Sequence, residues 1–279
     1  MGERDVDVKA AVRKHYANIV REGAGCGCAP ATGGCCGATS APATLSREIG
    51  YSDHDLAAVP EGANLGLGCG NPLAHAALRP GDVVVDLGSG AGFDCFLAAR
   101  GVGPTGRVIG VDMTPEMLDR ARRNAADDGY ENVEFRLGEI ENLPVADAGA
   151  DMVISNCVIN LSTDKPRVFR EALRILKPGG KLMVSDLVLE RPLPESVRRS
   201  VEAYAGCIAG AVLRDDYLAA IRDAGFTDVE VLAESGYDIG ASNPDESELA
   251  LVNDADVTPE DARAAAAAVK SVKVSAVKP

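Results

Sequence analysis

The sequence predicts an α/β protein with a doubly wound, parallel sheet and a small α+β unit towards its C-terminal end. Two short apolar runs, residues 83–85 and 108–111, have the length and valine content of buried parallel strands, and an aspartate follows each run. Residues 93–100, between the runs, are compatible with a helix. Strand, helix and strand in this order are typical of a parallel sheet with helices packed on its faces.

Later segments continue the same alternation. Thr114 and Pro115 are a helix-capping residue and a first-turn proline, so they predict the start of a second helix. Residues 166–176 predict a third helix, which the turn-forming residues 177–180 would end. Three further apolar runs predict the remaining strands of the sheet: residues 133–135, 152–154 and 181–184.

Composition divides the chain into three parts. Residues 5–21 predict a helix that leads into glycine- and cysteine-rich loops, so residues 1–72 form an N-terminal part. Residues 73–190 form the α/β unit. In residues 191–279 a helix containing Cys207, a helix over residues 215–224 and strands at 229–231 and 272–277 predict the α+β domain.

Charge and hydropathy exclude several classes of function. The formal net charge of −14 repels nucleic acid, and the sequence has no basic block that would neutralise phosphates. No apolar run reaches the ~20 residues of a membrane span, and the first residues lack a signal-peptide pattern, so we expect a cytoplasmic protein without membrane partners. The eight cysteines should then be reduced thiols. The acidity could also be an adaptation to high salt.

A glycine-rich loop follows the first predicted strand. In Asp86-Leu87-Gly88-Ser89-Gly90-Ala91-Gly92 the glycines allow the backbone to approach a ligand closely. The spacing differs from the G-x-G-x-x-G dinucleotide motif, and the acid precedes the glycines, so the loop favours a small zwitterionic cofactor over a pyrophosphate. Asp112, at the end of the second strand, is placed to accept hydrogen bonds from both hydroxyls of a ribose.

The loop and Asp112 together resemble the S-adenosylmethionine-dependent methyltransferases of the Rossmann-like class. In that family the loop holds the amino-acid end of the cofactor, the acid after the second strand holds the ribose, and residues after the third strand flank the adenine. The resemblance implies the following cofactor-binding residues here: Asp86, Gly88, Ser89, Gly90, Asp112, Met113, Ile140, Glu141 and Asn156.

Three cysteines lie in separate motifs near this predicted site. Cys69 stands between glycines in a loop, so packing explains it poorly, and Cys157 follows the fourth strand at the sheet edge where α/β proteins bind ligands. Cys207 could equally belong to an apolar helix face. Three converging thiolates would suit a soft, trigonal-pyramidal centre such as trivalent arsenic, whereas structural zinc takes four ligands, commonly from C-x-x-C pairs that this sequence lacks.

The sequence is similar over nearly its whole length to the arsenite S-adenosylmethionine methyltransferases. Four segments carry this resemblance: residues 64–72, 86–94, 154–161 and 202–207. The family pattern implies that Cys69, Cys157 and Cys207 bind As(III), and that an N-terminal cysteine, Cys36 or its neighbour Cys35, takes part in reduction. It further implies arsenite and methylated trivalent arsenicals as substrates, a thioredoxin-like protein or small thiols as reductant, and a role in arsenic detoxification.

Two alternatives stay open at this point. The chain could methylate a small organic acceptor such as a quinone, with the cysteines incidental. It could instead be a thiol-rich metal-sequestering protein with a vestigial glycine loop, although the intact Asp86 and Asp112 argue against this. Cys26 and Cys28 could be part of a solvated loop or could deliver extra thiols.

Overall fold

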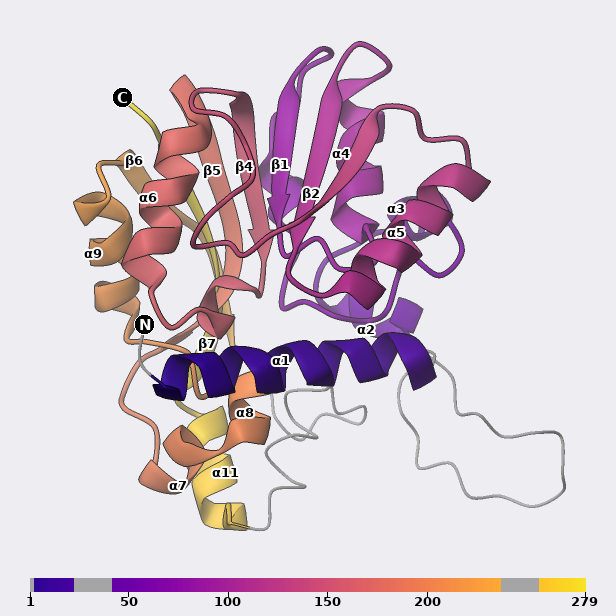
Figure 1. Cartoon of the computed structure of the whole chain (residues 1–279). Helices are drawn as coiled ribbons and strands as arrows, with labels where there is room; N and C mark the ends of the chain where they lie inside the picture. Colours follow the sequence, from indigo (N-terminus) through magenta and orange to yellow (C-terminus); the bar gives the residue numbers. More distant parts are fainter. Residues whose placement is uncertain (1–2, 23–41, 237–255) are drawn as a thin grey trace, which may run out of the picture.

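A computed structural model describes residues 3–22, 42–236 and 256–279 (Figure 1). Their strands form one seven-stranded sheet in the order β3-β2-β1-β4-β5-β7-β6. The first five strands are parallel, and β7 runs antiparallel to both β5 and β6. The strand bounds are β1 Val83–Leu87, β2 Arg107–Asp112, β3 Val133–Leu137, β4 Ala150–Asn156, β5 Leu176–Leu189, β6 Thr227–Gly236 and β7 Val269–Val277.

Helices cover both faces of this sheet and its carboxyl edge. One face packs against α4 and α5, and the other packs against α6 and α9. Helix α1 lies across the carboxyl ends of the strands, with α7, α8 and α11 on its far side (Figure 1). The helices are α1 Glu3–Glu22, α2 Pro42–Glu48, α3 Asp53–Ala57, α4 Phe93–Val102, α5 Pro115–Asp127, α6 Lys165–Ile175, α7 Glu195–Arg199, α8 Val201–Ala205, α9 Arg214–Asp223 and α11 Pro259–Ala266, with short 3-10 turns η1 Pro72–His75 and η2 Ile159–Leu161.

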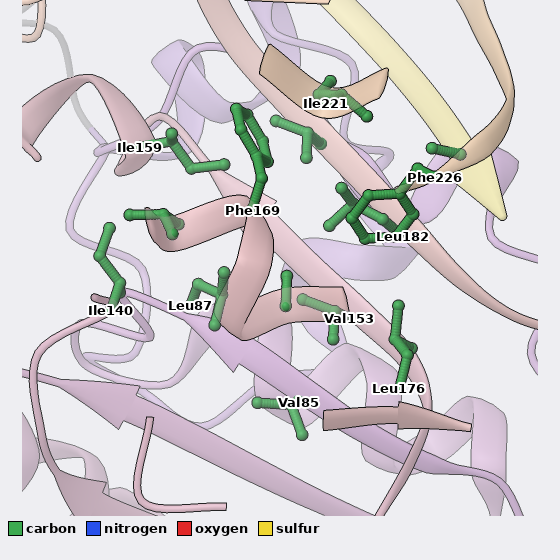
Figure 2. Close-up of a cluster of buried hydrophobic side chains, with 14 of the residues drawn as sticks. Val85, Leu87, Ile140, Val153, Ile159, Phe169, Leu176, Leu182, Ile221 and Phe226 are labelled. Carbon is green, nitrogen blue, oxygen red and sulfur yellow. The ribbon is translucent and has the colours of Figure 1, made fainter. Parts of the chain in front are cut away.

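The apolar spacing of the sequence explains the two cores. In β1, Val84 faces the α4 and α5 side, while Val85 and Leu87 face the α6 and α9 side, because successive side chains of a strand point to opposite faces. Figure 2 shows the second core, where the Phe169 ring of α6 lies among side chains of the sheet and of α9. The predicted doubly wound α/β sheet is confirmed.

The C-terminal part differs from its prediction in two respects. Strands β6 and β7 join the same sheet as β1 to β5, because β7 pairs with β5 along its whole length from Val269 to Val277. The predicted helix that contains Cys207 is wrong: α8 ends at Ala205, and Cys207 lies in a turn with a φ of 65°. The division of the chain at residues 72 and 190 stays a prediction. No helix in the described ranges is both long and apolar enough to cross a bilayer.

Candidate active site

The loop after β1 is held at the carboxyl edge of the sheet by backbone hydrogen bonds. The N–H groups of Gly88 and Ser89 both donate to the Val111 carbonyl oxygen of β2, at 2.8 and 3.1 Å. Gly88 has a φ of 69°, and a Cβ atom there would lie 2.3 Å from the Val158 side chain. Only glycine fits this position, and the loop therefore exposes backbone atoms to the pocket.

Asp112 ends β2 and faces this loop. Its carboxylate accepts hydrogen bonds from the N–H groups of Gly90 and Thr114, at 2.9 and 2.8 Å. Burial raises the pKa of Asp112 above its ordinary value, and these two donors oppose that rise. The Thr114 side chain and the Met113 backbone also hydrogen-bond to this carboxylate. An ionised carboxylate accepts hydrogen bonds, and Asp112 lines the pocket, so it fits the hydroxyl groups of a ribose.

Two more carboxylates make the pocket strongly favourable for a cation. Burial raises the pKa of Asp86 well above its usual range, and the nearby charges of Asp94 and Asp112 raise it further. For Asp94, burial raises the pKa to about 6, although hydrogen bonds from Tyr51 and Asn156 lower it. Carboxylates that repel one another are stabilised by a positive ligand. S-adenosylmethionine carries both a sulfonium and an ammonium group, so the residues present fit this cofactor.

The far wall of the pocket contains the residues predicted to flank the adenine. Ile140 is buried, and the Glu141 carboxylate accepts a hydrogen bond from Ser162 at 2.6 Å. Glu141 also forms an ion pair with Lys9 of α1, at 3.0 Å. Met113 contributes an apolar surface to the same pocket. The side chain of Glu141 is therefore engaged within the protein, and its backbone carbonyl oxygen accepts from Arg167 at 2.7 Å, so Ile140 and Met113 are the residues left to flank an adenine.

Helix α1 forms a wall of this pocket, which the sequence did not predict. Lys9, Val12 and Tyr16 line it, at helical spacings of three and four residues. Lys9 ties the helix to Glu139 and Glu141, and the Tyr16 hydroxyl donates to the Ala205 carbonyl oxygen at 3.1 Å. The helix thereby joins the cofactor side of the pocket to the segment that carries Cys207.

Asn156, at the end of β4, connects the pocket to the Cys69 loop. Its side-chain oxygen accepts the N–H of Cys69 at 3.1 Å, and its amide nitrogen donates to the Gly70 carbonyl oxygen at 2.8 Å. The same nitrogen contacts Tyr51 and Asp94, at 3.0 and 3.2 Å. Asn156 also lines the cofactor pocket. Its predicted contact with the cofactor stays a prediction, whereas its hold on the Cys69 loop is direct.

Cys157 and Cys207 both lie in backbone conformations that are rare for residues with a side chain. Their φ values are 58° and 65°, in the left-handed region that favours glycine. The Cys157 N–H donates to the Ser185 carbonyl oxygen at 2.8 Å, and the Cys207 thiol donates to the Cys157 carbonyl oxygen at 2.8 Å. Strain of this kind concentrates at functional sites. Both cysteines line the same pocket as the glycine loop.

The structure brings the thiols of all three predicted arsenic ligands together. Contact with the Cys207 thiol lowers the pKa of Cys157, but contact with the Cys69 thiol and burial outweigh it, so this pKa lies well above its usual range. Contact with Cys157 and burial likewise raise the pKa of Cys207. The thiols of Cys157 and Cys207 therefore keep their protons at neutral pH, and a ligand must displace these protons.

Asp186 is a fourth polar residue in this cluster, and sequence reasoning missed it. Its carboxylate and the thiols of Cys69 and Cys157 all lie within 4.8 Å of one another. Burial raises the pKa of Asp186 to about 7, against hydrogen bonds from Leu187 and Tyr217 that lower it. A signal was present: Asp186 lies at the same carboxyl edge as Asp86 and Asp112, on a strand of the same parallel set.

The cysteines predicted to take part in reduction belong to another part of the chain. Cys36 and Cys35 lie outside the described residues, as do Cys26 and Cys28. The fourth free thiol of the described ranges is Cys95, whose fully buried sulfur donates to Asp86 at 3.2 Å. This thiol belongs to the cofactor side of the site.

Comparison with known proteins agrees with this geometry. Residues 78–225 match the family model described as a methyltransferase domain. An arsenite methyltransferase of Halobacterium salinarum is 50% identical over 238 residues, which is 83% of this chain and 60% of the relative. The human arsenite methyltransferase is 32% identical over 232 residues, which is 80% of this chain and 59% of the relative. This chain thus spans about three fifths of the length of these curated relatives.

A solved structure gives the same result. The crystal structure of an arsenic(III) S-adenosylmethionine methyltransferase from Chlamydomonas reinhardtii superposes with a TM-score of 0.61 at 35% identity, over 83% of this chain and 72% of that one. Both the sequence and the fold of the chain are thus similar to those of an enzyme with this activity. The chain belongs to the arsenite S-adenosylmethionine methyltransferase family and carries its methyltransferase domain.

Proposed function

We propose that this protein transfers methyl groups from S-adenosylmethionine to As(III) bound by Cys69, Cys157 and Cys207. One observation carries the proposal: a single pocket is lined both by the glycine loop with Asp112 and by Cys157 and Cys207. Thiolates are soft ligands and suit a thiophilic metalloid. An ordinary methyltransferase pocket has no need for a Cys157 thiol that contacts both the Cys69 and the Cys207 thiols, so the cluster argues against an organic acceptor such as a quinone.

The binding of arsenite by three thiols releases water and no net protons. Each thiol that replaces a hydroxide of arsenite forms an As–S bond, and the thiol proton leaves with the hydroxide as water. This exchange is consistent with thiols that are protonated in the free protein, as the raised pKa values of Cys157 and Cys207 indicate. The lone pair of the bound arsenic is then the nucleophile, and it has no proton for a general base to remove.

The protein's contribution to the transfer is alignment. S-adenosylmethionine, when bound, supplies an electrophilic methyl group. The glycine loop and Asp112 hold the cofactor side, while Asn156 and the strained turns at Cys157 and Cys207 fix the thiol side. Alignment of two bound reactants can be equivalent to an effective concentration of about 10⁵ M or more.

Methylation raises arsenic to the pentavalent state, and two electrons return it to the trivalent state. Two thiols can supply these electrons as they join in a disulfide: a free thiol attacks the sulfur of one As–S bond, the electron pair of that bond returns to arsenic, and the proton of the attacking thiol is released. Cys36 is our candidate for one of the two, with Cys35 as the alternative, and a thioredoxin-like protein or small thiols would then reduce the disulfide. Substrates would include methylated trivalent arsenicals, and the role would be arsenic detoxification in the cytoplasm.

Arsenic speciation tests the proposal directly. Purified, reduced protein is incubated with arsenite, S-adenosylmethionine and thioredoxin, and the arsenic species are separated by chromatography, beside a Cys157→Ser variant. Methylated arsenic from the unmodified protein alone is the expected result. If cofactor binding is demonstrated and yet no methylated arsenic forms, the proposal fails and an organic acceptor becomes the better candidate.

A further inference from the structure

The thiol cluster contains a hard ligand that an arsenic site does not require. The Asp186 carboxylate lies within 4.8 Å of both the Cys69 and the Cys157 sulfur atoms. Trivalent arsenic is satisfied by three thiolates and a lone pair, so the carboxylate has no place among its ligands. Zinc and cadmium, in contrast, take four ligands and accept sulfur and carboxylate oxygen in the same site. Only the folded structure supplies this mixed donor set.

Hydrogen bonds fix the orientation of the carboxylate. One oxygen of Asp186 accepts from the Asn160 amide at 2.8 Å and from the Leu187 N–H at 2.9 Å, and the other accepts from the Tyr217 hydroxyl at 2.9 Å. The side chain is fully buried. Partners of this kind orient a metal-ligating carboxylate and reduce the ordering that binding requires. The second oxygen keeps an acceptor site free.

The charges around the cluster fit a divalent cation. Lys165 is half-buried, and its ammonium group donates to the Ser162 carbonyl oxygen at 3.1 Å and interacts electrostatically with Asp186. Two thiolates and one carboxylate around a divalent cation leave one negative charge, which Lys165 balances. Three thiolates around As(III) are neutral by themselves, and Asp186 and Lys165 then balance each other. The site can thus hold either occupant without an uncompensated buried charge.

We propose that Cys69 and Cys157, as thiolates, and the Asp186 carboxylate bind a thiophilic divalent cation, zinc or cadmium, with a water molecule as the fourth ligand. The cation and As(III) share two thiols, so each excludes the other. Such a cation would inhibit methylation and would also shield the thiols from oxidation. The cation site does not depend on the proposed methylation, because it needs only these side chains.

Two variants distinguish cation binding from As(III) binding. Cadmium is titrated into the whole chain with Cys26, Cys28, Cys35 and Cys36 replaced by serine, and the ultraviolet thiolate-to-cadmium absorption band is followed. Zinc affinity is measured by competition with a chelator. Asp186→Asn should weaken zinc and cadmium at least ~10-fold and leave As(III) affinity nearly unchanged. Cys207→Ser should do the reverse, because arsenic loses its third thiolate while the cation keeps Cys69, Cys157 and Asp186.

The opposite patterns overturn the inference. If Asp186→Asn binds cadmium as tightly as the unmodified protein, the carboxylate is not a ligand. If this variant loses cadmium and As(III) to the same degree, Asp186 only holds the thiols in place. A protein that binds cadmium at this site but neither binds nor methylates As(III) would refute the proposed function and leave the cation site standing. Far-ultraviolet circular dichroism confirms that each variant is folded.

Discussion

The cofactor side and the thiol side of the pocket are built in different ways. On the cofactor side, the groups facing the ligand are backbone atoms and acids within a few residues of two strand ends, β1 and β2. On the thiol side, Cys69, Cys157 and Cys207 come from three distant segments, and two of them are held in left-handed backbone conformations. The first side depends on local geometry, and the second depends on the correct packing of the whole sheet edge.

The largest expected effect comes from the thiol side. Cys157→Ser replaces the thiol that contacts both of the others, and a hydroxyl is a poor ligand for a soft centre. Arsenite methylation should become undetectable, while the dissociation constant of S-adenosylmethionine stays within ~2-fold because the cofactor side is separate. Isothermal titration calorimetry and arsenic speciation measure the two quantities.

Cys95→Ser is the matched control for this change. It alters a buried cysteine that donates to Asp86, and serine keeps a donor at that position. Most of the methylation activity should survive. Equal loss in both variants would mean that the thiol cluster has no special role.

The second effect tests the cofactor side. Gly88→Ala places a methyl group 2.3 Å from the Val158 side chain, at a positive φ, and the loop must move away from the pocket. Overpacking of this kind costs about 1–3 kcal/mol, so cofactor affinity should fall ~10- to 100-fold. As(III) binding, followed by intrinsic tyrosine fluorescence, should change far less.

Gly179→Ala controls for backbone strain alone. Gly179 has a φ of 78°, but a Cβ atom there would meet nothing within 4 Å. This variant should lose about 1–2 kcal/mol of folding stability and keep its cofactor affinity. If both variants weaken cofactor binding equally, strain rather than close packing is responsible.

The two sides also differ in how far the sequence predicted them. Glycines and an acid next to a strand end have local structural consequences, so the sequence alone was enough to predict that the loop and Asp112 lie side by side, as they do in the structure. The apolar pattern around Cys207 matched a helix equally well, but the chain turns there with a φ of 65°, which packing against the Cys157 backbone stabilises. The hydrophobic periodicity of the sequence does not indicate this contact with the Cys157 backbone.

Contacts between residues that are far apart in the sequence could not be predicted for the same reason. Asp186 lies within β5, two residues beyond the predicted strand 181–184, and only the pairing of β4 with β5 brings it beside Cys157. Helix α1 was predicted as a helix, but its position over the pocket depends on the ion pairs of Lys9 with Glu139 and Glu141, more than a hundred residues away. Composition indicates neither arrangement.

Asn156 is the link between the two sides, and its removal should have an intermediate effect. Asn156→Ala leaves the N–H of Cys69 and the carbonyl of Gly70 without partners, which costs about 1–3 kcal/mol and should weaken As(III) binding ~10-fold or more. Asn132→Ala is the control, because that amide also bonds two backbone carbonyls, those of Ala99 and Gly103. The control should lose stability but keep As(III) affinity in fluorescence titrations.

The smallest effect concerns the buried acids of the cofactor side. The folded-state pKa of Asp94 is about 6, above the usual 3.8 expected for the unfolded chain, so the native state keeps a proton that the unfolded state loses between these values. The free energy of unfolding of the free protein should therefore fall as pH rises from about 4 to about 6, by on the order of 1 kcal/mol. Urea unfolding at several pH values measures this slope.

Asp94→Asn should reduce that slope, because asparagine does not titrate, while the raised pKa values of Asp86, Asp112 and Asp186 maintain the rest of it. Asp127→Asn, an exposed site with the same change of charge, should leave it intact. Bound S-adenosylmethionine should also flatten the slope, since its positive charge favours the ionised carboxylate and lowers the pKa of Asp94. As(III) bound to three thiolates forms a neutral complex, so it should leave the slope unchanged. If As(III) changes the pH dependence of the free energy of unfolding and the cofactor does not, then Asp94 responds to the thiol side of the pocket. The two sides would then not be electrostatically separate.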